Sequence, residues 1–236
     1  MSPVRIAVVD YGAANMVSIT RALAAVAADV VVAEDAAGLA GADAIVVPGV
    51  GAAASAMAYL TERGLRDPLI EWARAGRPFL GICLGFQILF ESSDEGDAEA
   101  LGLLPGRTVG LVDAPTLPHI GWNSVEFVRP HPLFDGVRDG SYFYFVHSYA
   151  PAPADDGDVI ARTTHGRPFV SAAGRGALYG LQFHPEKSSD AGLRVLSNFV
   201  DLVAAGAGRA AASVGALTSG SRSAGAAVSH SAGGVA

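Results

Sequence analysis

Short runs of apolar, mostly β-branched residues alternate with Ala- and Leu-rich stretches through the first half of the chain. The runs occupy residues 4–9, 30–33, 44–47 and 79–82, and the stretches occupy residues 16–27, 55–62, 68–75 and 84–91. Strands that are apolar throughout belong to a parallel sheet covered on both faces by connecting helices. The pattern predicts an α/β domain with a doubly wound, mostly parallel sheet, in which Asp67 caps the third helix and Pro68 begins it.

The second half of the chain changes character. Strands separated by turns are predicted at residues 126–128, 142–150, 159–163, 169–172 and 177–183. Such closely spaced strands indicate either an antiparallel extension of the first sheet or a small subsheet beside it.

One domain is predicted for residues 1–205, followed by a tail at residues 206–236. The domain ends in a helix that begins at Ser188 or Ser189 and shows helical apolar spacing up to Val203. The tail is largely Ala, Gly, Ser, Thr and Val, without an aromatic residue. Because such a segment buries too little apolar surface to offset its ordering entropy, we expect it to be disordered and assign it no function.

Composition excludes several classes of protein. Charged residues make up 17% of the 236 residues, the net charge is −7, and Lys and Arg are dispersed, so no nucleic-acid partner is expected. The uncharged stretch 44–61 is interrupted by residues 48–51, Pro-Gly-Val-Gly, and reads as strand, turn and helix rather than a membrane span. With no secretory signal and a single cysteine, the chain is expected to be cytoplasmic.

The one cysteine, Cys83, follows the apolar run 79–82 and lies between Gly81 and Gly85. A lone cysteine is more often a buried small hydrophobe. Here, however, the glycines permit the sharp strand-to-helix turn that presents a nucleophile above a sheet. A helix N-terminus there favours the thiolate, and the Leu84 N–H could donate to an oxyanion. We therefore predict Cys83 as a nucleophile.

His184 and Glu186 follow another apolar run and are separated by Pro185. A neutral imidazole can accept the thiol proton, and a nearby carboxylate can orient the imidazole and support its charged form. Without Cys83, a surface turn would be the better interpretation. With Cys83, the three residues predict a nucleophile–base–orienter triad that attacks a carbonyl.

Residues 48–51 could supply a second oxyanion donor, since Gly49 and Gly51 allow a peptide N–H near Val50 to turn toward the same sheet edge. From this segment alone, an ordinary turn is the better interpretation.

The remaining histidines predict no metal site. His119, His131 and His165 lie next to Pro or Gly in predicted turns without metal-ligand spacing, and His147 reads as a hydrogen-bonded pocket histidine. No cofactor or metal is expected.

Together these residues resemble the class I (triad) glutamine amidotransferases. Beyond the cysteine elbow and His-Pro-Glu, the stretches that resemble the glutaminase subunits of imidazole glycerol phosphate synthases are residues 10–15, 48–51, 117–123, 144–149 and 184–188. The resemblance spans residues 4–203. Phe86 stands where methionine is more usual, which could alter packing behind the substrate, and Ala14 stands where glycine often precedes the asparagine.

This resemblance implies a flavodoxin-like fold that hydrolyses glutamine to glutamate and ammonia. Cys83 would form a glutamyl thioester, and His184 would protonate ammonia and then activate water. The family pattern also places Gln87 and Glu95 at the glutamine and the backbone of Ser148 and Tyr149 at its carboxylate. Glu95 lies in an acidic loop, so simple solvation is an equal alternative for it.

The resemblance further implies a partner, a (β/α)8-barrel cyclase subunit that forms a heterodimer with the chain. Ammonia would be channelled to it to make imidazole glycerol phosphate and an aminoimidazole carboxamide ribotide in histidine biosynthesis. Asn15, Trp122, Tyr144 and Lys187 resemble the interface and gate, although Trp122 could be core and Lys187 a solvated charge. Residues 48–51 resemble a gating strand, so we expect weak glutaminase activity in the isolated chain.

Three alternatives remain open. Another triad amidotransferase, such as the pyridoxal-phosphate synthase glutaminase, would share the triad but not the segments at 121–123 and 144–149 together. A cysteine hydrolase or peptidase of the same fold would need no partner. A non-catalytic assembly module would need none of Cys83, His184 and Glu186.

Overall fold

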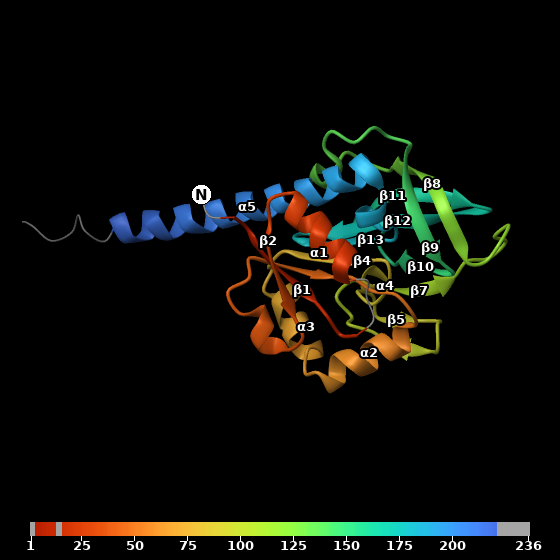
Figure 1. Cartoon of the computed structure of the whole chain (residues 1–236), viewed down its shortest axis with the longest axis horizontal. Coiled ribbons are helices and arrows are strands. Elements are labelled where there is room, and N and C mark those ends of the chain that lie inside the picture. The colour runs from red at the N-terminus through yellow and green to blue at the C-terminus, as the bar shows by residue number, and fades with distance from the viewer. Residues whose placement is uncertain (1–2, 13–15, 221–236) are drawn as a thin grey trace, which may run out of the picture.

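The computed structural model describes residues 3–12 and 16–220, with only the backbone for 207–220. Within these residues a nine-stranded sheet forms the centre of the molecule, in the order β2-β1-β3-β4-β13-β12-β11-β8-β9 (Figure 1). The first five strands of this order are mutually parallel, and the last four are antiparallel to their neighbours. The parallel strands are β2 (Asp29–Ala33), β1 (Arg5–Val9), β3 (Ala44–Val47), β4 (Phe79–Ile82) and β13 (Leu178–Leu181). The antiparallel strands are β12 (Arg167–Arg175), β11 (Val159–His165), β8 (His119–Phe127) and β9 (Ser141–His147).

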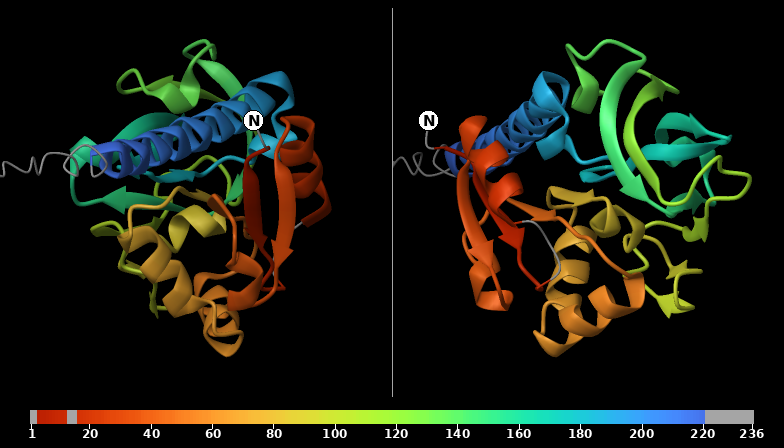
Figure 2. Two further views of the ribbon diagram at one scale, coloured as in Figure 1. Left: turned by 90° about the vertical axis from the view of Figure 1, so that its left-hand side faces the viewer. Right: turned by 45° about the vertical axis from the view of Figure 1, so that its right-hand side comes forward.

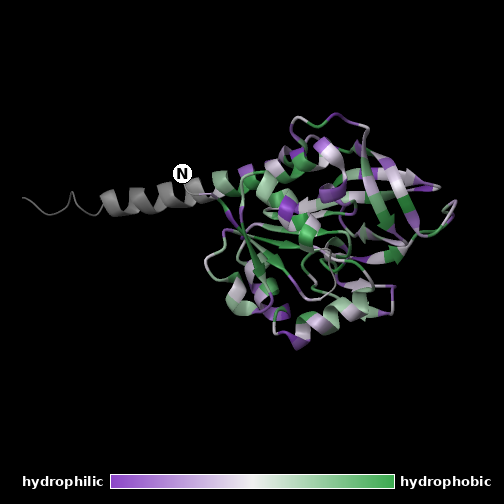
Figure 3. Ribbon diagram, viewed as in Figure 1, coloured by the Kyte–Doolittle hydropathy of each residue, from purple (hydrophilic) through white to green (hydrophobic). Residues whose placement is uncertain are grey.

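Helices cover both faces of the parallel part of the sheet (Figures 1 and 2). The helices α1 (Met16–Ala25) and α5 (Ser189–Gly220) pack with one face, and α2 (Ala53–Glu62), α3 (Arg66–Arg74) and the short α4 (Leu84–Gln87) pack with the other. Alternate residues of each strand enter opposite core clusters, so Ile6 and Val8 belong to one and Ala7 and Val9 to the other. The apolar colour of the central strands in Figure 3 reflects this burial on both faces. The predicted doubly wound α/β class is confirmed.

A second sheet of four strands lies beside the first, in the order β10-β7-β5-β6. Its strands are β10 (Tyr149–Pro153), β7 (Gly106–Gly110), β5 (Ser92–Ser93) and β6 (Ala98–Glu99). Single 3-10 turns occur at Ala36–Leu39, Pro132–Phe134, Asp156–Asp158 and Pro185–Lys187. Both of the arrangements predicted for the second half are therefore present, the antiparallel extension and the subsheet.

Several element boundaries differ from the sequence prediction. The helix predicted over 84–91 ends at Gln87, and helix α3 begins at Arg66 after Leu65, so Asp67 lies in its first turn rather than capping it. An acidic residue in a first turn still interacts favourably with the helix dipole, which explains the misassignment. The strand predicted over 142–150 is divided at Ser148 between β9 and β10.

Helix α5 continues to Gly220, so the boundary predicted at residue 205 does not end the regular structure. Ala has the highest helix propensity, and a helix that is already nucleated by packing extends at little cost. The expectation of disorder rested on the lack of an apolar period, a property that an unpacked helix and a disordered tail share. The last turns extend beyond the body of the molecule (Figure 1), and the predicted tail residues 221–236 lie outside the described residues. Among the described residues, no helix has the length and apolar character needed to cross a membrane.

Candidate active site

The predicted triad lies where the carboxyl ends of neighbouring parallel strands meet. Strand β4 lies between β3 and β13 and leads directly into Cys83, while β3 leads into residues 48–51 and β13 into His184. Open α/β sheets bind their ligands at this edge. The sheet order thus brings together three segments that are far apart in the sequence.

Cys83 occupies a strained turn between β4 and α4. Its backbone has φ 55° and ψ −110°, in the left-handed half of conformational space that a residue with a Cβ rarely adopts. A Cβ on Gly81 would contact the Gly85 carbonyl oxygen, and one on Gly85 would overlap the Val47 carbonyl oxygen. Both flanking glycines are therefore required by close backbone approach, and the turn is the elbow that the sequence predicted.

His184 and Glu186 form a buried pair. The His184 Nδ1 atom lies 2.8 Å from Glu186 Oε1, and both side chains are almost fully buried. Because a carboxylate accepts, Nδ1 carries the hydrogen. The buried Nε2 atom has no hydrogen-bond partner among the described residues, and the Cys83 thiol donates to the Val146 carbonyl oxygen at 3.8 Å. Burial by itself lowers the pKa of His184, but the interactions with Cys83 and Glu186 outweigh burial and raise that pKa to about 10. The pair therefore favours the imidazolium form of His184.

A cavity of about 150 Å³ opens beside Cys83. Its lining includes all four residues predicted to bind substrate, Gln87, Glu95, Ser148 and Tyr149. Sites for drug-sized ligands measure roughly 300–1,000 Å³, so this cavity suits a smaller molecule.

The half-buried Glu95 is placed at this cavity by helix α2. One of its carboxylate oxygens accepts a hydrogen bond from the Ala53 N–H, at 3.1 Å, in the first turn of that helix. The helix N-terminus stabilises a negative charge there. The geometry therefore differs from that of a freely solvated side chain, the alternative left open for Glu95.

Gln182 is a site residue that sequence reasoning missed. This fully buried side chain lies 3.7 Å from Cys83 Sγ through its Nε2 atom, and its Oε1 accepts from Gln87 Nε2 at 3.1 Å. Gln87 Nε2 also donates to the Tyr149 carbonyl oxygen, at 2.8 Å. The available signal was a polar residue at the end of an apolar strand, two positions before His184.

The predicted oxyanion donors do not point at a common position in this structure. The Leu84 N–H points at the Gly49 carbonyl oxygen, 3.4 Å away, rather than into free space. Because the peptide is trans, the Val50 N–H of the same peptide points away from Leu84. Gly51 has φ +98°, which its missing Cβ permits.

The Tyr11 hydroxyl lies directly beside this segment. A Cβ on Gly49 would overlap the hydroxyl oxygen, so Tyr11 allows only glycine at this position. The hydroxyl is buried and has no hydrogen-bond partner among the described residues. Burial, followed by the nearby charge of Cys83, raises the pKa of Tyr11.

Three of the four predicted interface residues form one cluster. The rings of Trp122 and Tyr144, on paired strands β8 and β9, meet edge to face at 6.3 Å, and Lys187 Nζ lies 5.7 Å from the Tyr144 ring centre. Trp122 is 51% exposed and is therefore not a core residue. The fourth, Asn15, lies outside the described residues.

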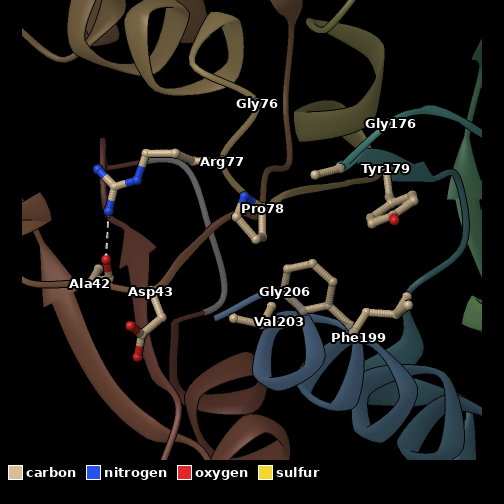
Figure 4. A pocket seen from close by; sticks show the side chains of 12 residues that line it. Ala42, Asp43, Gly76, Arg77, Pro78, Gly176, Tyr179, Phe199, Val203 and Gly206 are labelled. Carbon is tan, nitrogen blue, oxygen red and sulfur yellow. Dashed lines mark hydrogen bonds between the residues drawn. The ribbon is translucent and has the colours of Figure 1, made fainter. Parts of the chain in front are cut away.

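A larger cavity, of about 500 Å³, lies at the opposite edge of the sheet (Figure 4). It is lined by residues that precede β3, β4 and β13, including Asp43 and Arg77, and by Phe199 and Val203 of α5. Arg77 already donates to the Ala42 carbonyl oxygen at 2.7 Å and stacks on Trp72. The smaller cavity beside Cys83 is the one with reactive groups.

Comparison with known proteins agrees with this geometry. A family model described as glutamine amidotransferase class-I matches residues 7–202. The chain is 49% identical over 200 residues to a Symbiobacterium thermophilum protein named imidazole glycerol phosphate synthase subunit HisH, covering 84% of this chain and 94% of that protein. It is also 49% identical over 207 residues to the Halobacterium salinarum protein of the same name, covering 84% of this chain and 94% of that protein.

Solved structures share the fold at lower identity. The structure of PurLQS from Thermotoga maritima has a TM-score of 0.67 and 20% identity, covering 86% of this chain and 100% of that chain. A structure described as glutamine amidotransferase has a TM-score of 0.66 and 20% identity, covering 84% of this chain and 98% of that chain.

The chain therefore belongs to the class-I glutamine amidotransferases and, within them, to the family of HisH subunits of imidazole glycerol phosphate synthase. The resemblance drawn from its motifs is confirmed.

Proposed function

We propose that the chain hydrolyses glutamine through a Cys83 thioester and delivers the ammonia to a cyclase subunit. Cys83 Sγ attacks the side-chain amide carbon of glutamine, and the His184 imidazolium gives its proton to the amide nitrogen. The C–N bond then breaks and ammonia leaves. His184 next takes a proton from water, whose oxygen attacks the thioester and releases glutamate and the thiolate.

One observation carries this proposal: the strained Cys83 elbow lies beside a buried imidazole whose Nδ1–H is held by Glu186. A binding module would need neither the strain nor the buried pair, and both cost folding free energy. The cavity supplies complementary groups for an amino acid, since the Glu95 carboxylate suits an α-ammonium. Backbone N–H groups near Ser148 suit the α-carboxylate.

The oxyanion segment supports a gated enzyme. The Gly49 carbonyl oxygen accepts from the Leu84 N–H, the donor that would stabilise the tetrahedral oxyanion. Turning the Gly49–Val50 peptide would free Leu84 and aim the Val50 N–H at the same point. We infer that the partner, with its nucleotide bound, favours this turn, so the isolated chain has low activity.

The docking surface for that partner is the outer face of β8 and β9. Ile120, Trp122, Tyr142 and Tyr144 alternate onto this face, and three of them are more than half exposed. An exposed apolar patch of this kind is typical of an interaction site. The partner is a (β/α)8-barrel cyclase that forms a heterodimer with the chain.

This face is also linked to the triad. The Tyr144 carbonyl oxygen accepts from the His184 N–H at 2.9 Å, and Ser188 Oγ bridges the Tyr144 N–H and the His184 carbonyl oxygen. Channelling through the barrel would keep ammonia unprotonated, and hence nucleophilic, on its way to imidazole glycerol phosphate formation in histidine biosynthesis. The lone cysteine fits a reducing compartment, and we place the reaction in the cytoplasm.

Glutamine hydrolysis measured with and without the barrel subunit and its nucleotide tests the proposal. We expect low activity alone, strong stimulation in the complex, and loss of activity in Cys83→Ser. Full activity without a partner would contradict the gated enzyme and favour an independent cysteine hydrolase. Activity retained in Cys83→Ser would contradict the mechanism. Stimulation by a pyridoxal-phosphate synthase barrel instead would identify a different amidotransferase.

A further inference from the structure

A chain of buried polar groups runs from strand β8 to the cavity beside Cys83. Asn123 Nδ2 lies 3.2 Å from His119 Nε2, His119 Nδ1 lies 3.0 Å from His147 Nε2, and His147 Nδ1 lies 2.8 Å from the Tyr149 carbonyl oxygen. His119 and His147 are 4% and 6% exposed. The structure thus corrects the sequence prediction for His119, which is not in a turn but in strand β8, and His165 likewise lies in β11.

The hydrogen-bonded network ends at two carbonyl oxygens, those of Tyr149 and Thr164, and these determine which nitrogen carries each proton. The Tyr149 oxygen only accepts, so His147 Nδ1 carries a hydrogen and its Nε2 accepts from His119 Nδ1–H. His119 Nε2 then accepts from Asn123 Nδ2, whose other hydrogen goes to the Thr164 carbonyl oxygen at 2.9 Å. Asn123 Oδ1 accepts from the Ser124 N–H, which fixes the orientation of the amide.

The environment keeps both imidazoles in this neutral state. Protonating the ring of His119 or of His147 would place two N–H groups opposite each other within the hydrogen-bonded network. Burial, with a smaller contribution from the neighbouring His165, lowers the pKa of His147 to about 3 and that of His119 to about 4. His165 stacks on His119 with ring centres 4.0 Å apart.

The hydrogen-bonded network ends at the carbonyl group of Tyr149, a residue that lines the cavity beside Cys83. The Tyr149 carbonyl oxygen accepts from both His147 Nδ1 and Gln87 Nε2, so both of its lone pairs are used. Gln87 in turn donates to Gln182, which lies against Cys83. His147 therefore holds the Ser148–Tyr149 backbone and the Gln87 side chain in one arrangement.

We propose that His147, supported by His119 and Asn123, is a positioning residue for glutamine rather than a second base. The proposal rests on the glutaminase activity proposed above. His147 fixes the wall that receives the amino-acid end of the substrate, which is bound equally in the ground state and the transition state. Removing this support raises KM and leaves kcat nearly unchanged.

A pair of substitutions at His147 tests this in the complex with the barrel subunit. His147→Leu removes the donor to Tyr149, and we expect KM for glutamine to rise about tenfold, as for one lost hydrogen bond, with kcat within about threefold. In His147→Asn the side-chain amide can still donate to Tyr149, and we expect KM to return to within about threefold of wild type. His131→Asn, the same change outside the cavity, is the control with unchanged KM. A loss of kcat instead of a rise in KM, or no rescue by His147→Asn, would overturn the proposal.

The protonation pattern has its own readout. Long-range ¹H–¹⁵N spectra of the isolated chain should show His119 and His147 both as neutral Nδ1–H tautomers from pH 5 to 8. An Nε2–H tautomer for either ring would overturn the assignment. This measurement needs no turnover. An inactive wild-type complex would therefore contradict the proposed function, while the spectra alone would decide whether the hydrogen-bonded network has the assigned tautomers.

Discussion

At the scale of single residues, Glu186 determines how the imidazole serves Cys83. It lies 2.8 Å from His184 Nδ1 and contributes to the raised pKa of that ring. We predict that Glu186→Gln lowers kcat for glutamine hydrolysis about 10³-fold, since the neutral amide no longer stabilises the imidazolium. KM should change little, because Glu186 does not line the cavity.

Steady-state kinetics of the complex check this prediction, with the exposed Glu62→Gln as the matched control. A variant that keeps more than a tenth of the wild-type kcat would show that Glu186 does not orient the base.

The lowered pKa of His147 predicts a loss of stability in mild acid. An unfolded histidine binds a proton below about pH 6.5, whereas folded His147 stays neutral until about pH 3. The unfolded state therefore binds more protons between these values, and the free energy of unfolding falls by about 2 kcal/mol from pH 7.5 to pH 5 through this residue. His119 and His131, whose pKa values are also lowered, act in the same direction.

Urea unfolding at the two pH values measures this effect, and His147→Leu should show a smaller difference between them. His184 opposes it only in the upper part of this range, because its raised pKa keeps the folded ring protonated while the unfolded ring loses its proton above about pH 6.5. Since His184 is present in both proteins, the comparison of wild type with His147→Leu isolates the contribution of His147. Identical pH dependence in wild type and variant would rule out the assigned pKa of His147.

The sequence made the triad predictable but not the groups that support it. Each triad residue follows an apolar run and lies near Gly or Pro, as Cys83, His184 and Glu186 show. This signal is local in the sequence and can be read without knowing which strands pair. The contact between His119 and His147 joins residues 28 positions apart and depends on the register of β8 and β9. Nothing in the spacing of single residues encodes that register.

At the scale of elements, the β4–α4 elbow depends on glycines that leave no room for a side chain. A Cβ on Gly85 would overlap the Val47 carbonyl oxygen of β3. We predict that Gly85→Ala destabilises the fold by more than about 3 kcal/mol, since buried backbone must move. Gly206→Ala, in helix α5 with open space around its Cβ, should instead stabilise by about 0.5–1 kcal/mol.

Denaturant unfolding measures the free energy of unfolding of both variants. A loss in Gly85→Ala alone would be due to the close packing around Gly85, whereas a loss in both would mean that the protein tolerates alanine for glycine poorly in general. Equal stability of Gly85→Ala and wild type would mean that β3 and α4 are not held at this distance.

The elements that sequence predicted well are those buried on both faces. The bounds predicted for β3 and β4 coincide with the observed ones, because every residue there is apolar. Strand β8 was predicted only at its end, since its exposed residues Ile120 and Trp122 are apolar while its buried residue His119 is polar, the reverse of the usual pattern. A strand whose outer face is apolar does not show the usual polar–apolar period of two.

At the scale of the whole molecule, the exposed face of β8 and β9 lies at the opposite edge of the sheet from β2. We predict that Trp122→Ala weakens binding of the barrel subunit about 10- to 100-fold, as expected for an exposed aromatic anchor. Val32→Ala, which truncates an exposed side chain on β2, should leave binding unchanged.

Titration calorimetry with the purified cyclase subunit measures both affinities. Equal affinities for wild type and Trp122→Ala would remove the β8–β9 face from the interface.

The Gly49 carbonyl oxygen accepts from the Leu84 N–H, and this contact should affect glutamine hydrolysis but not alkylation at Cys83. Iodoacetamide alkylates a thiolate by displacement, and no negative oxygen develops on a carbonyl in that step. Labelling of Cys83 should therefore proceed at similar rates with and without the barrel subunit, while glutamine turnover rises strongly in the complex. Mass spectrometry of the alkylated chain, compared with turnover, would then distinguish a change in the oxyanion donors from a change in the reactivity of the sulfur. The partner would be seen to control where a backbone N–H points rather than how reactive the sulfur is.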